Sequence, residues 1–194
     1  MARRRLIRPV AAALGLIAVL GLSAACGVDE SSKGDSDLTL VGYSVAREVY
    51  SDLIPAFNAT SVGKEATFKQ SYGASGEQSR AVADGLDADI VAFSFEPDIT
   101  RLVDAGLVDT DWNAGPEKGM VSDSVVVLIV RAGNPEGITG WDDLTRDGLE
   151  VITPNPFTSG AAQWNILGAY GAMSDVGKDE AAGLAYIDAL FENV

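Results

Sequence analysis

Two serine–glycine pairs are the residues of this sequence whose types and positions are best suited to chemistry. Ser75-Gly76 lies within residues 70–82 (QSYGASGEQSRAV), and Ser159-Gly160 lies within residues 153–165 (TPNPFTSGAAQWN). In both, a strand-like run leads into a loop of small residues and then into a helical pattern. The first N–H groups of a helix have no partner within the helix, and the helix dipole favours negative charge there. Because glycine lets an anion come close to these groups, each turn predicts a site for a small oxyanion.

Each serine on its own also fits a simpler role, as an N-cap that accepts a hydrogen bond from its own helix. For either turn alone this alternative is the stronger one. Two such turns on opposite halves of the chain shift the balance towards a ligand. Ligands of open α/β sheets bind beyond the carboxyl ends of the strands, which is where both loops are expected.

Catalysis by either serine is the third alternative, and the composition argues against it. The chain has no histidine and a single cysteine. Histidine-based nucleophile arrangements, histidine-containing zinc sites and cysteine clusters for metal are therefore excluded. A serine hydrolase would need a lysine base, and neither serine has a lysine near it in sequence. We expect a protein that is not an enzyme and that uses no cofactor and no metal.

The net charge limits the classes of partner that this protein can bind. The 194 residues contain 14 Lys and Arg against 28 Asp and Glu, a formal net charge of −14. A nucleic-acid binder needs cationic surface to displace counterions from phosphates, so we expect no nucleic-acid partner. With 47% apolar and 22% charged residues, the chain has the composition of an ordinary folded protein.

The first 25 residues read as an export signal. Four arginines lie within the first eight residues, residues 10–22 form an uncharged apolar run, and small residues follow. This run is shorter than the roughly 20 residues that span a bilayer. The segment LSAAC resembles the lipobox of bacterial lipoproteins, which implies a lipid on Cys26, although Leu22 lies one place further from the cysteine than is usual. Polar residues 26–37 then predict a flexible tether. Loss of the leader brings the net charge to −18.

The remaining chain alternates between strand and helix patterns, which predicts an α/β fold with a mainly parallel sheet. We assign residues 38–121 to a first α/β lobe and residues 122–194 to a hinge strand and a second α/β lobe. Residues 122–131 (SDSVVVLIVR) predict a central strand buried on both faces. The other strands are expected at 38–43, 66–71, 89–94 and 149–153, and the helices at 47–58, 77–86, 98–105, 160–173 and 178–191, with one helical turn at 141–145.

Six short blocks, in this order and spacing, resemble the sulfate- and thiosulfate-binding proteins of bacterial ABC importers. The resemblance covers the chain from about residue 38 to its end. The resemblance implies a periplasmic-binding-protein-like fold of type II, in which two α/β lobes close on one anion held at helix N-termini. The blocks are SVARE at 44–48, SYGASG at 71–76, ADIV at 88–91, VRAGNP at 130–135, VITPNP at 151–156 and TSGAAQWN at 158–165.

Carried over by position, the resemblance implies five anion contacts. Ser75 would donate through its backbone and hydroxyl, and Ser159 through its hydroxyl. Gly160 and Ala161 would donate backbone N–H groups, and Val45 would do so from the first loop between a strand and a helix. Family members commonly have an acid at the place of Val45 and a glycine at the place of Ala161.

Two other positions bear on the site. The family usually has a basic residue where this chain has Glu77. Because a carboxylate in the first turn would repel a dianion if it pointed inward, we expect Glu77 to face solvent. The family's remaining contacts, a backbone donor and a tryptophan indole, come from a segment that would follow residue 194. We therefore expect a receptor cut short, in which Trp164 packs and binds no anion.

The sequence thus predicts a monomeric receptor, exported and held at the membrane by lipid, that delivers sulfate or thiosulfate to an ABC permease. Sulfate carries no proton at neutral pH, so its site needs donors alone, and neither loop has an acid before its serine–glycine pair. The alternatives are a receptor for another oxyanion such as phosphate or molybdate, an exported serine hydrolase, and a lipoprotein with a structural or adhesive role.

Overall fold

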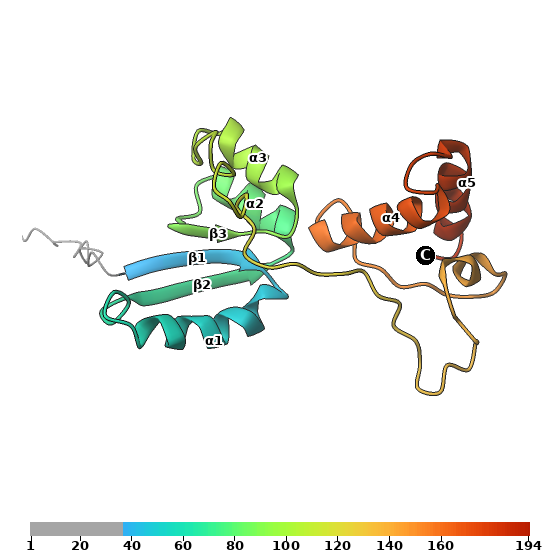
Figure 1. Ribbon diagram of the computed structural model, residues 1–194, viewed down its shortest axis with the longest axis horizontal. Coiled ribbons are helices and arrows are strands. Elements are labelled where there is room, and N and C mark those ends of the chain that lie inside the picture. Colours follow the sequence, from blue (N-terminus) through green and yellow to red (C-terminus); the bar gives the residue numbers. More distant parts are fainter. Residues whose placement is uncertain (1–36) are drawn as a thin grey trace, which may run out of the picture. The chain divides into compact units, whose positions relative to one another are not determined.

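A computed structural model describes residues 37–194 of the chain (Figure 1). The predicted leader, Cys26 and all but the last residue of the predicted tether lie outside the described residues. Three parallel strands form one sheet in the order β2-β1-β3. They are β1 (Asp37–Tyr43), β2 (Thr67–Gly73) and β3 (Ile90–Ala92). Asp37, expected at the end of the tether, is the first residue of β1.

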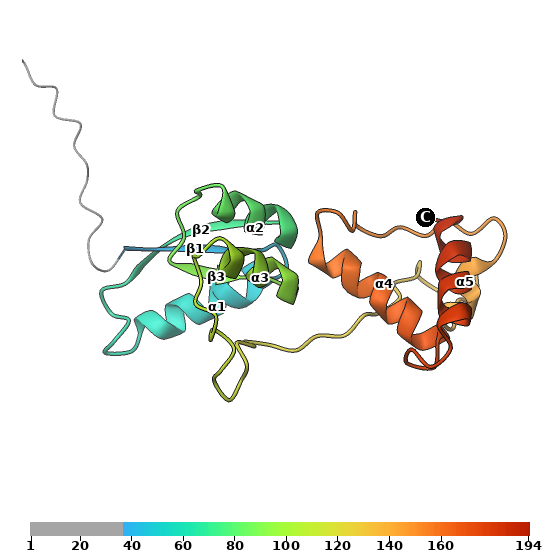
Figure 2. The same cartoon turned by 90° about the horizontal axis from the view of Figure 1, so that it is seen from above.

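Helices connect these strands and cover both faces of the sheet, with α1 on one face and α2 and α3 on the other (Figures 1 and 2). They are α1 (Ala46–Asn58), α2 (Ser75–Ala83) and α3 (Glu96–Asp104). The centre of β1 is buried on both faces, as its apolar sequence predicts. Val41, Val82 and Leu102 form the core between sheet and helices. The prediction of alternating strands and helices is confirmed for this part of the chain.

The later part of the described chain contains helices joined by irregular segments. It contains a 3₁₀ helix, η1 (Trp141–Thr145), followed by α4 (Gly160–Met173) and α5 (Glu180–Phe191). A second hydrophobic cluster joins them, made of Leu144, Ala169, Tyr186 and Leu190. The Tyr186 hydroxyl donates to the carbonyl of Trp141 at 2.5 Å, which ties α5 to η1. The helical turn at 141–145 and both long helices are confirmed.

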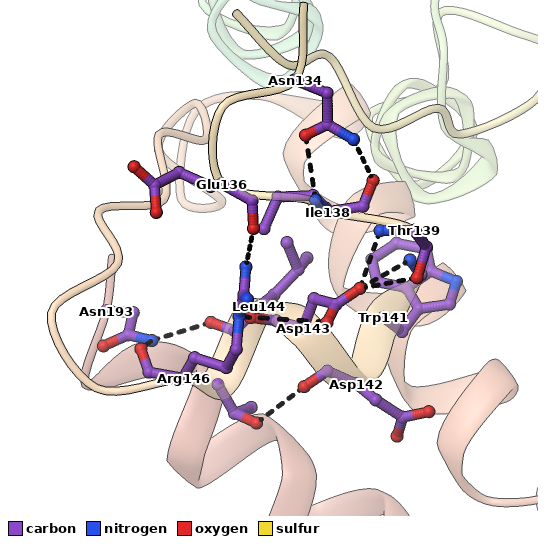
Figure 3. Close-up of polar contacts among 12 residues, drawn as sticks. Asn134, Glu136, Ile138, Thr139, Trp141, Asp142, Asp143, Leu144, Arg146 and Asn193 are labelled. Carbon is purple, nitrogen blue, oxygen red and sulfur yellow. Dashed lines mark hydrogen bonds and ion pairs between the residues drawn. The ribbon is translucent and has the colours of Figure 1, made fainter.

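Side-chain hydrogen bonds shape the turn that leads into η1 (Figure 3). Asn134, in the left-handed region at φ 46°, donates to the Ile138 carbonyl and accepts from the Ile138 N–H. The Asp143 carboxylate accepts from both the N–H and the hydroxyl of Thr139, at 2.7 and 2.9 Å. Asn193, after α5, donates to the carbonyls of Leu144 and Arg146. These bonds hold the turn without a neighbouring strand.

Two predicted strands are absent from the described residues. Residues 122–131 and 149–153 adopt neither helix nor strand, so the prediction of a buried central strand at 122–131 is wrong for this structure. A strand forms only where a neighbour accepts and donates its ladder hydrogen bonds, and no described strand lies beside either segment. Val125, Val127 and Ile129 are instead exposed, Ile129 to 92%. Within residues 122–194 the structure therefore describes helices and no strand.

Candidate functional site

Both serine–glycine turns form the starts of helices. Ala74 is the N-cap of α2, so that Ser75 and Gly76 are its first two residues. Ser159 is the N-cap of α4, and its hydroxyl oxygen accepts from the N–H of Ala162 at 3.3 Å. The N-cap alternative is therefore confirmed for Ser159 and wrong for Ser75. The Ser159 hydroxyl proton is still available, because a cap oxygen accepts without using it.

The two helix starts meet. The N–H of Gly76 donates to the carbonyl of Thr158 at 3.0 Å, which links the loop before α4 to the first turn of α2. Gly160 packs so closely that a Cβ there would lie 2.6 Å from Ser94 Oγ and 2.8 Å from Phe95 Cβ. Turns 84 residues apart, counted from Ser75 to Ser159, thus lie side by side. They bring the N-terminal ends of two helix dipoles to one place.

The buried carboxylate of Asp98 lies beside this junction. Ser75 is only 2% exposed, and its hydroxyl donates to Asp98 Oδ2 at 2.6 Å while accepting from the N–H of Ser94 at 3.0 Å. The other oxygen of Asp98 accepts from Arg101 at 3.0 Å. The Ser75 hydroxyl has a single proton, and in this structure it donates that proton in the hydrogen bond to Asp98. The backbone N–H of Ser75, in the first turn of α2, is the group that geometry leaves for a ligand.

The N–H groups of Gly160 and Ala161 lie in the first turn of α4, where helix geometry provides no acceptor. Val45 lies just after β1 at the start of α1, and its side chain is exposed. The neighbouring Ser44 N–H donates to the carbonyl of Gly73 at 2.8 Å, which places this loop beside the one that leads into α2. All five predicted contacts therefore lie at starts of helices, and the starts of α2 and α4 touch through Gly76 and Thr158.

Trp164 packs as expected. Its ring meets Phe95 edge to face at 5.6 Å between centroids, and its indole N–H donates to the carbonyl of Ser94 at 2.7 Å. Glu77 is exposed, as expected for a carboxylate next to a predicted anion site. Sequence reasoning missed Ser94 and Asp98. The one available signal was an acid in the first turn of a predicted helix, and the sequence does not show that this acid is buried.

The site offers hydrogen-bond donors and helix dipoles rather than ligands for a cation. Within residues 37–194, no group of three or more acidic, histidine or cysteine side chains could hold a metal ion. In the same range, no helix is long and apolar enough to cross a membrane. The chemistry that this arrangement supports is therefore the binding of a small anion.

Comparisons with known proteins agree with this geometry. Residues 38–193 match the family described as bacterial extracellular solute-binding protein. The chain is 42% identical over 191 residues to a sulfate-binding protein of Synechococcus elongatus, covering 94% of this chain and 55% of that protein. It is 35% identical to a thiosulfate-binding protein of Pseudomonas aeruginosa, covering 89% of this chain and 54% of the relative.

A solved structure gives the same result. The sulfate-binding protein SubI of Mycobacterium tuberculosis H37Rv superposes with a TM-score of 0.78 at 53% identity, covering 80% of this chain and 54% of SubI. The chain spans about half the length of the relatives it matches. The relatives are solute-binding proteins and not enzymes, and the parallel sheet with its covering helices is consistent with the type II fold. The chain therefore belongs to the family of bacterial extracellular solute-binding proteins.

Proposed function

We propose that this chain is an extracytoplasmic receptor that captures sulfate or thiosulfate for import by an ABC permease. The observation that carries the proposal is the direct contact between the starts of α2 and α4, where the N–H of Gly76 donates to the carbonyl of Thr158. Relatives named for sulfate and for thiosulfate support the choice of anion. The proposed contacts are the N–H groups of Val45, Ser75, Gly160 and Ala161 and the hydroxyl of Ser159.

The donor set favours sulfate over phosphate. A phosphate site gains from an acceptor that meets the phosphate proton, whereas a fully ionised sulfate needs donors only. Asp98 is a carboxylate in contact with a predicted site residue, and one of its oxygens accepts from Ser75 while the other accepts from Arg101. Its acceptor capacity is thus directed at protein donors, which supports a ligand without a proton.

A serine hydrolase has no support at either serine. Ser75 is buried and donates to a carboxylate, while Ser159 caps its own helix. Nucleophilic catalysis requires a base that takes the serine proton and is in turn oriented by a third group. Asp98 accepts from Ser75 and is itself held by Arg101, but the Ser75 side chain is buried and its hydroxyl is not exposed to a substrate. The Ser159 hydroxyl contacts the backbone N–H of Ala162, which is not a base.

We further propose that the receptor is exported by its leader, works as a monomer and is held on the outer face of the membrane by a lipid on Cys26. The lipobox-like segment carries this part of the proposal. Residues 38–121 and 122–194 would then be its two lobes, closing on the anion. Metabolic labelling with a fatty-acid analogue tests the anchor, since a Cys26→Ser variant should take up no label.

Isothermal titration of the full chain with sulfate, thiosulfate, molybdate, phosphate and chloride tests the function. We expect tight binding of sulfate or thiosulfate and none of chloride. Ser159→Ala should weaken binding by about ten- to a hundredfold, because a hydrogen bond to a charged group contributes about 1.5–3 kcal/mol.

Ser51→Ala is the matched control, since its hydroxyl donates to the carbonyl of Glu48 within α1 and is not among the proposed contacts. It should bind like the unaltered chain. If the unaltered chain bound neither sulfate nor thiosulfate, or bound molybdate more tightly, the proposal would be wrong.

A further inference from the structure

Ser94 has an unusual hydroxyl. Among the residues that the structure describes, only two buried side-chain polar atoms have no hydrogen-bond partner, Ser94 Oγ and Asn58 Oδ1. A buried polar atom without a partner costs about 1–3 kcal/mol, so native proteins keep few of them. Such an atom therefore calls for an explanation, and its place in the fold suggests one.

Ser94 lies between two of the predicted anion contacts. Its backbone N–H donates to the hydroxyl of Ser75 at 3.0 Å, so it adjoins the first residue of α2. Its own hydroxyl oxygen is the atom nearest to a Cβ placed on Gly160, at 2.6 Å, so it also adjoins the first residue of α4. The unpartnered hydroxyl is thus located where the N-terminal ends of both helices converge.

The position follows from the fold. Ser94 comes two residues after the end of β3, at the carboxyl edge of a parallel sheet, where α/β proteins bind their ligands. Its carbonyl is held by the indole of Trp164, at 2.7 Å. Because its N–H and its carbonyl both make hydrogen bonds across the junction, the backbone at Ser94 is held from two sides.

We propose that the Ser94 hydroxyl is an additional donor to the bound oxyanion, alongside the contacts proposed above. This inference rests on the proposed function and assigns a further specificity-determining residue to the same site. An O–H donor matches a sulfate oxygen, and the missing partner of Ser94 Oγ is then the ligand itself. The site keeps an unsatisfied donor in the free protein and satisfies it on binding.

The proposal predicts opposite effects of Ser94→Ala on stability and on binding. Without sulfate, the variant should melt at the same temperature as the unaltered chain or higher, because it loses an unpartnered polar atom. Its affinity for sulfate should fall by about ten- to a hundredfold. A purely structural role for Ser94 would lower stability and affinity together, so the two measurements separate the roles.

Titration calorimetry and thermal melting of the full chain with sodium sulfate make the test, with Asn58→Ala as the matched control. Asn58 carries the other unpartnered atom, at the end of α1, and its replacement should leave sulfate affinity unchanged. If the unaltered chain binds sulfate and Ser94→Ala binds it equally well, this inference is overturned while the proposed function stands. If the unaltered chain binds thiosulfate and not sulfate, the same comparison is made with thiosulfate, and if it binds neither anion, both are overturned.

Discussion

Gly160 is the residue on which the approach of the two helix starts depends most directly. A methyl group there would lie 2.6 Å from Ser94 Oγ and 2.8 Å from Phe95 Cβ, closer than real contacts allow. We expect Gly160→Ala to lower the free energy of unfolding by about 1–3 kcal/mol, the usual cost of overpacking. It should also weaken anion binding, because α4 must shift away from Ser94.

Gly171, in the same helix, provides the control. A Cβ there would meet nothing within 4 Å, and its φ is not in the left-handed region. Alanine should therefore stabilise α4 by up to about 1 kcal/mol through helix propensity. Urea unfolding of both variants makes the comparison. Equal stability of the two would show that the close approach at Gly160 does not constrain the fold.

Single residues were predictable from the sequence where local chemistry decides their role. Ser159 could be placed at a helix start because its own hydroxyl caps that helix. The partner of Ser75 could not be found in this way, since Asp98 lies 23 residues further along and meets it only through the packing of α3 on α2. Burial of an acid depends on the whole fold, and the pattern of neighbouring residues does not show it.

At the scale of elements, η1 is held by a charged group. The N–H and hydroxyl of Thr139, with the N–H of Gly140 and the charge of Arg146, hold the pKa of the Asp143 carboxyl below its ordinary value of 3.8 (Figure 3). The folded chain thus favours the ionised form more than the unfolded chain does. This stabilisation is fully present above the ordinary pKa and is lost as pH falls through the lower pKa of the folded state.

Asp143→Asn should therefore lower stability at neutral pH and flatten its decline in acid. Guanidinium unfolding between about pH 2.5 and pH 7 measures both effects. Asp175→Asn removes the same charge from an exposed pair with Lys178 and should change neither. An unchanged acid slope in the Asp143 variant would assign the acid sensitivity to other carboxylates.

Helices and strands differed in how far the sequence could predict them. The helices at 160–173 and 180–191 form because each makes its own backbone hydrogen bonds and buries one side on the other. Residues 122–131 are rich in the β-branched residues that favour strands, but a strand makes its hydrogen bonds with a neighbouring strand. The sequence shows which residues suit a strand, and only the fold shows whether a partner lies beside them.

At the scale of the whole molecule, the net charge repels an anion whereas the proposed site attracts it. Residues 26–194 carry a net charge of −18, yet the proposed ligand is a dianion. Diffuse charge is screened over about 8 Å at physiological ionic strength, whereas the helix N-termini act at contact distance. The net charge should therefore govern how fast the anion arrives, and the site should govern how long it stays.

Stopped-flow binding of sulfate at increasing sodium chloride concentration separates these two contributions. Because salt screens the repulsion between an acidic protein and an anion, the association rate should rise, by up to about tenfold, between low and physiological ionic strength. The dissociation rate should change little, since it reflects hydrogen bonds made at contact distance. An association rate that falls with salt would mean that the field at the mouth of the site is positive. The local dipoles of α2 and α4 would then outweigh the charge of the whole molecule even at a distance.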